Sequence, residues 1–134
     1  METTFKSVIA VGGGLASFLF GGWSALLSIL LAFVVIDYVT GFIAAGAEGK
    51  LSSEVGFKGI AKKILIFVLV AVGHLLDKAL GGQNDMFRDA TIFFFLANEL
   101  LSIIENAGRA GVPIPQILQN AVEILKGKGD EKNG

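Results

Sequence analysis

The longest stretch without a charged side chain limits most strongly what this sequence can fold into. No Asp, Glu, Lys or Arg occurs from Ser7 to Ile36, and 53% of the 134 residues are hydrophobic while 17% are charged. A typical soluble domain has roughly 25% charged residues. A soluble fold of this length keeps much of its surface in water and leaves too little interior for so much apolar area. We therefore expect an all-α integral membrane protein with three to four transmembrane helices plus amphipathic interfacial helices.

Composition also excludes several classes of function. The net charge of −1 provides no electrostatic basis for binding nucleic acid. The chain has no Cys and one His, which excludes a disulfide scaffold, a thiolate metal site and a multi-histidine metal site. We find no Ser/His/Asp triad and no phosphate-binding loop. The sequence predicts neither an enzyme nor a protein with a metal ion or cofactor.

Hydropathy predicts a transmembrane helical domain over residues 1–110. The expected spans are about 5–21, 22–46, 61–80 and 86–108, and residues 47–62 form a cytoplasmic interfacial connection on the membrane surface. As a helix, the first span is about 25 Å long, slightly short of the roughly 30 Å hydrocarbon core. Three alternatives therefore stay open for this segment: three spans with an external N-terminus, a cleaved signal peptide, or a mobile Gly-rich arm.

Residues 111–134 are expected to form a cytoplasmic unit. Pro113 and Pro115 end the preceding helix. The apolar residues from Ile114 to Leu125 recur at helical spacing, which predicts an amphipathic helix for an interface or a partner. Residues 127–134 are charged and Gly-rich, and this composition predicts a disordered tail.

Basic residues predict the orientation of the spans. They gather in the 47–62 connection and after the last span, and these two regions lie two crossings apart. By the positive-inside rule both regions are cytoplasmic, which also places the C-terminus in the cytoplasm. The residues that we expect to act as cytoplasmic basic anchors are Lys58, Lys62, Lys63 and Arg109.

Two acids are expected near the middle of the membrane. Asp37 lies about 21 Å along its helix from Trp23, and Glu99 about 17 Å along its helix from Arg88. Neither span offers a Lys or Arg at that depth, and ionisable groups there usually face the bundle interior or water. One interpretation is a pore or polar seam, and the alternative is hydrogen bonding between neighbouring helices only. The residues expected to line the pore or seam are Asp37, Asn98, Glu99, Ser102 and Glu105.

Two smaller patterns concern helix faces. His74 and Asp77 share a face near the outer end of their span, either as a pH-sensitive pair or as an interfacial pair without a switching role. Small residues allow helices in a membrane to approach closely. The residues that we expect to serve helix packing in this way are Gly13, Ser17, Gly21 and Gly41.

Several polar motifs between about Ile36 and Lys126 are distinctive: DYVTG (37–41), GKLSS (49–53), VGFKGIAKK (55–63), HLLD (74–77), RDA (88–90), ANELLSI (97–103), EN (105–106) and GVPIP (111–115). Together they resemble those of the toxin-secretion/phage-lysis holins. This family includes phage holins of Gram-positive hosts and the small membrane protein of clostridial large-toxin loci. The resemblance implies a homo-oligomerising, non-enzymatic protein of the bacterial cytoplasmic membrane. It implies permeabilisation that releases an endolysin, or in some members a toxin, without stable contact to that cargo.

Two other functions compete with this interpretation. A small four-helix proton-coupled multidrug-type transporter also centres on a membrane carboxylate, but it needs neither the Lys-rich connection nor the amphipathic C-terminal helix. A membrane anchor would recruit a cytoplasmic partner through residues 113–126, and deleting that segment would then abolish its function.

Overall fold

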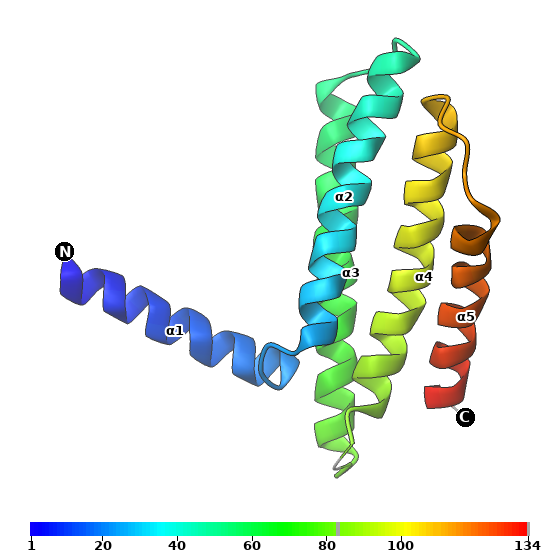
Figure 1. Ribbon diagram of the computed structural model, residues 1–134. Coiled ribbons are helices and arrows are strands. Elements are labelled where there is room, and N and C mark those ends of the chain that lie inside the picture. The colour runs from blue at the N-terminus through cyan, green and yellow to red at the C-terminus, as the bar shows by residue number, and fades with distance from the viewer. Residues whose placement is uncertain (83, 134) are drawn as a thin grey trace.

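The structure, a computed structural model, describes residues 1–82 and 84–133, and within these ranges it contains five α-helices and no strand. In Figure 1 the N-terminal helix projects away from the other helices, which lie side by side. This confirms the all-helical fold class. The helices are α1 (Glu2–Phe20), α2 (Ala25–Ala47), α3 (Ser53–Ala79), α4 (Met86–Arg109) and α5 (Gln116–Asn133).

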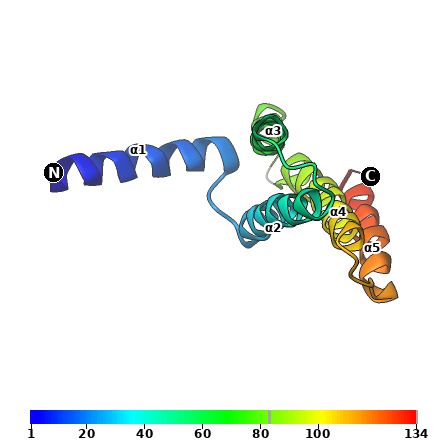
Figure 2. The same ribbon diagram turned by 90° about the horizontal axis from the view of Figure 1, so that it is seen from above.

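Helix α4 is the centre of the bundle because it packs against α2, α3 and α5 (Figures 1 and 2). Apolar side chains from α2, α3 and α4 form one buried cluster, which excludes water from the middle of the bundle. Helix α1 contributes no fully buried residue. The buried cluster consists of Leu27, Leu30, Val34, Ile66, Val70, Ile92 and Leu96.

Short polar signals set the ends of these helices. The hydroxyls of Ser24 and Ser52 accept hydrogen bonds from the backbone N–H groups of Leu27 and Val55, each at 3.2 Å, and so cap α2 and α3. Gly21 ends α1 with φ 72°, a left-handed conformation that glycine adopts without strain.

Three helices are long and apolar enough to cross a membrane: α1, α2 and α3. They correspond to the first three expected spans. The fourth expected span, 86–108, falls in α4, which is 24 residues long but carries five charged residues. Large apolar side chains are exposed along α1, α2 and α3, as expected where lipid is the solvent.

Two segments differ from the expectation. The connection between α2 and α3 is limited to residues 48–52, and α3 then runs without interruption from Ser53 into the third span. No proline separates these parts, so nothing forces a break. The expected surface helix and the third span are therefore one helix.

The charged segment after residue 126 also differs from the expectation, since α5 continues to Asn133 instead of becoming disordered; Gly134 lies outside the described residues. Gly129 is buried, and a Cβ there would lie 3.5 Å from the carbonyl oxygen of Ala90 and 3.6 Å from Cβ of Phe93. Contact with α4 thus offsets the weak helix propensity of the glycines in this segment.

Candidate functional site

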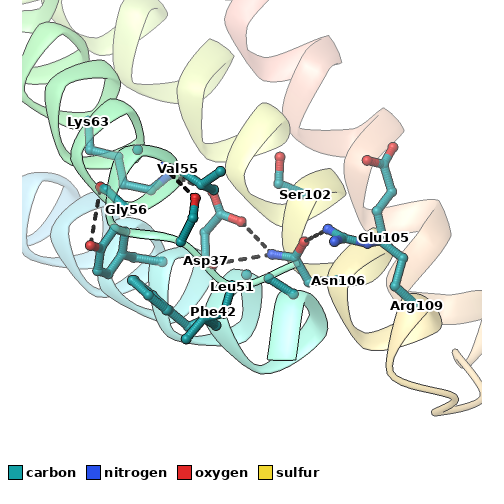
Figure 3. Close-up of a pocket in the computed structure, with 15 residues that line it drawn as sticks. Asp37, Phe42, Leu51, Val55, Gly56, Lys63, Ser102, Glu105, Asn106 and Arg109 are labelled. Atoms are coloured by element: carbon teal, nitrogen blue, oxygen red, sulfur yellow. Dashed lines mark hydrogen bonds and ion pairs between the residues drawn. The ribbon is translucent and has the colours of Figure 1, made fainter. Parts of the chain in front are cut away.

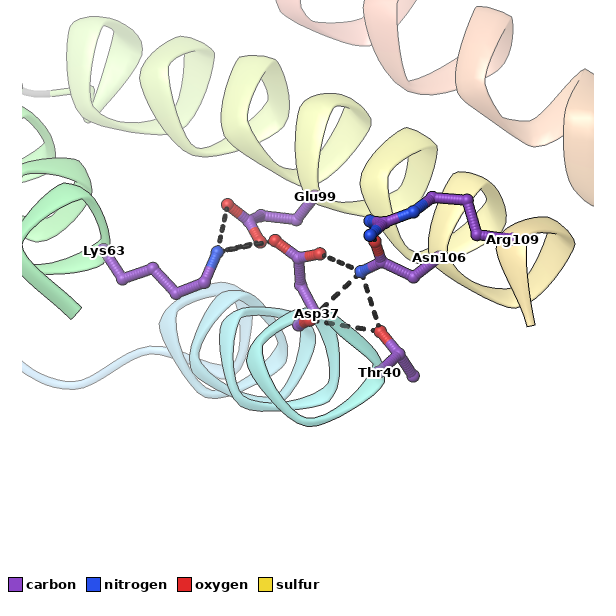
Figure 4. A network of polar contacts seen from close by, with 6 residues as sticks. All are labelled: Asp37, Thr40, Lys63, Glu99, Asn106 and Arg109. Carbon is purple, nitrogen blue, oxygen red and sulfur yellow. Dashed lines mark hydrogen bonds and ion pairs between the residues drawn. The ribbon is translucent and has the colours of Figure 1, made fainter. Parts of the chain in front are cut away.

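One lysine binds both acids that the sequence places near the middle of the membrane. The Lys63 ammonium lies 2.5 Å from Oδ2 of Asp37 and 3.1 Å from Oε2 of Glu99 (Figure 4). Asp37 and Glu99 are 8% and 5% exposed, and the Lys63 side chain is 17% exposed. The three side chains come from α2, α3 and α4, so this cluster, the inner cluster, joins three helices through one cation.

The expectation that Asp37 and Glu99 lack a cation at their depth is wrong. Each member of the inner cluster lies ten positions from the helix end near the α2–α3 turn: Asp37 before the end of α2, Lys63 after the start of α3, and Glu99 before the end of α4. At about 1.5 Å per residue, all three lie about 15 Å from those ends. The sequence predicts Lys63 among the cytoplasmic basic anchors, whereas the unbroken α3 places it ten residues from the helix start, beside Asp37 and Glu99.

Asn106 extends the inner cluster along α4. Its Nδ2 donates to Oδ1 of Asp37 at 2.8 Å, to the backbone oxygen of Asp37 at 3.2 Å and to the hydroxyl of Thr40 at 3.0 Å. Asn106 is 8% exposed, so these contacts satisfy an amide that would otherwise be buried without partners. Asn106 follows Glu99 by seven residues, or two helical turns, and this spacing is the signal in the sequence that could have identified it.

An ion pair joins the ends of α2 and α4. Arg109 Nη2 lies 2.5 Å from Oε1 of Glu48, and Arg109 Nη1 donates to Oδ1 of Asn106 at 3.3 Å. The hydrogen bond from Arg109 holds the pKa of Glu48 below its ordinary value, and the same bond raises the pKa of Arg109. Polar contacts therefore run continuously from the inner cluster to the end of the bundle that we expect on the cytoplasmic side.

A cavity of about 260 Å³ opens beside this polar path (Figure 3). Ser102 and Glu105 line it, as do Asp37 and Lys63 of the inner cluster. Asn98 does not line this cavity and is exposed. The structure therefore brings together the other four residues expected at the seam: Asp37 and Glu99 in the inner cluster, and Ser102 and Glu105 at the adjoining cavity. Several polar side chains lie in the wall of the cavity, which is large enough to hold water.

A second group of contacts, the outer cluster, holds the opposite end of α4. The carboxylate of Asp77 accepts hydrogen bonds from the backbone N–H groups of Phe87 at 2.9 Å and Arg88 at 3.0 Å. An acid at the first turn of a helix satisfies free N–H groups and complements the helix dipole. Asp77 therefore caps α4, although the sequence suggested a pairing with His74 on its own helix.

Arg88 and His74 connect the outer cluster to α1. Arg88 Nη1 donates to the backbone oxygen of Phe20 at 2.7 Å, while Arg88 Nη2 lies 3.1 Å from Oδ2 of Asp85. His74 is 3% exposed; its Nδ1 has no hydrogen-bond partner and lies 3.7 Å from Oδ1 of Asp85. A Cβ on Gly21 would lie 2.5 Å from Cε1 of His74, so only glycine fits where α1 ends against α3.

The four small residues expected at helix contacts have different surroundings. A Cβ on Gly41 would lie 3.6 Å from Nδ2 of Asn106, so Gly41 faces α4, and Gly21 faces His74. A Cβ on Gly13 would have no described neighbour within 4 Å, and Ser17 is exposed. Any packing role of the last two residues therefore involves another molecule.

The other basic residues of α3 lie at its surface. Lys58 is exposed and lies 3.6 Å from Glu54, four residues earlier on the same helix. Lys62 is also exposed. Among residues 1–82 and 84–133, no three His, Cys, Asp or Glu side chains are grouped so as to hold a metal ion.

Comparisons with known proteins place this architecture among phage-related membrane proteins. Residues 14–127 match the model of the bacteriophage holin family. A probable holin of Bacillus phage phi105 is 33% identical over 106 residues, which cover 79% of this chain and 78% of that protein. No solved structure matches.

Two relatives from bacteria match over nearly their full length. An uncharacterized protein of Listeria monocytogenes is 47% identical over 131 residues, covering 98% of this chain and 93% of that protein. An uncharacterized protein of Halalkalibacterium halodurans is 48% identical over 131 residues, covering 95% of this chain and 97% of that protein.

Proposed function

Since the chain belongs to the bacteriophage holin family and is an all-helical multi-pass membrane protein, we propose that it opens a lesion in the bacterial cytoplasmic membrane. Several copies accumulate there and associate as a homo-oligomer. The lesion releases an endolysin, or a toxin, with which the chain makes no stable contact. The protein performs no catalysis of its own.

The inner cluster is the observation that carries this proposal. Charged side chains at membrane depth are costly and mark pathways for water or ions. In the single chain, Asp37 and Glu99 are buried between helices and neutralised in part by Lys63. In the lesion, water wets the same polar faces, which explains why the chain keeps acids at this depth. The lumen residues are Asp37, Asn98, Glu99, Ser102 and Glu105.

The proposed orientation follows from the exposed basic residues. Lys58, Lys62 and Arg109 lie toward the α2–α3 turn and the end of α4, and we assign this end of the bundle to the cytoplasm. Residues 1–110 then form the transmembrane domain, and residues 111–134 form the cytoplasmic unit.

In this proposal, helix α5 moves from α4 to the surface of the membrane. In the single chain Val122 is buried and Leu125 packs against the apolar cluster, while Glu123 and Lys126 on the other face are exposed. A charged residue at the centre of a spanning helix costs about 2.5–3.5 kcal/mol. With α4 in the bilayer, α5 therefore leaves α4 and places its apolar face on the cytoplasmic surface of the membrane.

Inducible expression in a bacterium tests the proposed function. The chain is expressed with and without a cytoplasmic cell-wall-degrading enzyme, and the enzyme is also expressed alone. Rapid lysis only in the strain that makes both proteins supports the proposal. Intact cells despite normal amounts of the chain in the membrane would contradict it.

A further inference from the structure

We propose that Lys63 acts as a charge latch: it ties α2 and α4 to α3 in the closed single chain and thereby sets when the lesion opens. This inference rests on the proposed function, because the timing of lysis is its consequence. The family resemblance assigns no individual role to Lys63.

The geometry gives Lys63 a position that no other described cation shares. Its ammonium contacts one carboxylate on α2 and another on α4, at 2.5 and 3.1 Å. Each of these residues lies in the middle part of its helix, so the contacts join side chains and leave the backbone hydrogen bonds of the helices untouched. Such contacts can be exchanged for water without unwinding a helix.

The surrounding groups provide no substitute for Lys63. Around Asp37, Asn106 and Thr40 are uncharged. Arg109 is engaged by Glu48 and by Asn106 Oδ1, and Glu105 adds a further acid to the wall of the cavity. The hydroxyl of Tyr38 donates to the backbone oxygen of Gly56.

The balance of charge determines the direction of the effect. With Lys63 present, two carboxylates share one ammonium. Without it, Asp37 and Glu99 remain buried side by side, and removing one partner of a buried ion pair is strongly destabilising because it leaves charge without compensation. Water in an open lumen relieves this repulsion. Loss of Lys63 therefore favours the open state, whereas loss of one acid leaves a balanced pair and favours the closed state.

Lysis timing tests the latch in the strain that also makes the cell-wall-degrading enzyme. We expect Lys63→Gln to bring lysis forward at least about twofold, Glu99→Gln to delay it, and Lys63→Arg to stay near the unmodified chain. Lys78→Gln is the matched control, since it removes the same charge from an exposed position on the same helix. Membrane amounts are measured for every variant.

A charge exchange keeps the test decisive if Lys63→Gln fails to accumulate. The double variant Asp37→Lys with Lys63→Asp restores an ion pair across the same two helices, and we expect it to lyse later than Asp37→Lys alone. Equal lysis times for Lys63→Gln and Lys78→Gln at equal amounts would overturn the latch, as would equal times for the double and single variants. If the unmodified chain itself releases no enzyme, the proposed function fails instead.

Discussion

The start and the middle of α4 are held by different kinds of contact. At the outer cluster, Asp77 binds two backbone N–H groups and Arg88 binds a backbone carbonyl of α1. At the inner cluster, the described contacts of the Lys63 ammonium are to two carboxylates, and Asn106 adds one hydrogen bond to the backbone oxygen of Asp37. Contacts to backbone groups at helix ends are lost only when those ends move or unwind. From this comparison we expect the outer cluster to hold the start of α4 in place and the inner cluster to be the part of the bundle that rearranges.

Removing the cap of α4 has the largest expected effect. Asp77→Ala leaves two N–H groups near the buried helix start without acceptors, and we expect a loss of about 2–4 kcal/mol in the free energy of unfolding. Thermal unfolding in detergent followed by circular dichroism measures it. Asn84→Ala, in the nearby exposed turn, is the control. Equal stability of the two variants would contradict the claim that Asp77 stabilises the start of α4.

A side chain at the end of α1 has the next largest expected effect. Gly21→Ala forces a left-handed residue and places Cβ 2.5 Å from Cε1 of His74, at a cost of about 1–2 kcal/mol. Gly22→Ala has a similar φ of 92° but no described atom within 4 Å of its Cβ, so it carries the backbone strain alone. We expect Gly21→Ala to unfold at lower denaturant concentration. If Gly22→Ala unfolded at the lower denaturant concentration instead, the contact between the end of α1 and His74 would be contradicted.

Shortening Asn106 tests how much its hydrogen bonds stabilise the inner cluster. Asn106→Ala removes the donor to Asp37 and Thr40, and we expect the free energy of unfolding to fall by about 1 kcal/mol. Asn98→Ala, on an exposed position of the same helix, should change this free energy less. A larger effect at Asn98 than at Asn106 would show that the inner cluster is arranged differently.

The exposed pair between Glu48 and Arg109 has the smallest expected effect. Because Arg109 lowers the pKa of Glu48 from its ordinary 4.5, the stabilisation from the pair is fully present above pH 4.5 and is lost as the pH falls through the lowered value. Unfolding temperatures of the unmodified chain and Glu48→Gln should therefore differ slightly at pH 7 and converge at pH 2. A difference that grows on acidification would contradict this assignment.

The sequence predicted the helices and their membrane character because apolar runs, prolines and basic residues are local signals. It also predicts that Asp37 and Glu99 lie at membrane depth, and the structure brings these two acids together. It does not reveal the partner of these acids, since Lys63 follows Lys62 in a charged segment whose composition is typical of a surface connection. Equal distances from a short turn place residues of two antiparallel helices at equal depth, and this count locates Lys63 opposite Asp37 once the turn is known.

Contacts between distant segments were harder to predict. Asp77 was expected beside His74 because both lie on one face of a helix, but its carboxylate turns to the start of α4, which the sequence of α3 does not encode. The continuation of α5 past Gly127 similarly depends on its contact with α4. In both cases a tertiary partner overrides the local pattern.

Release of markers from closed vesicles tests the central claim most directly. The purified chain is inserted into vesicles that contain a small dye and a marker of protein size. The proposed lesion releases both markers above a threshold amount of protein. Retention of the protein-sized marker at every amount, with the chain fully inserted, would contradict the account.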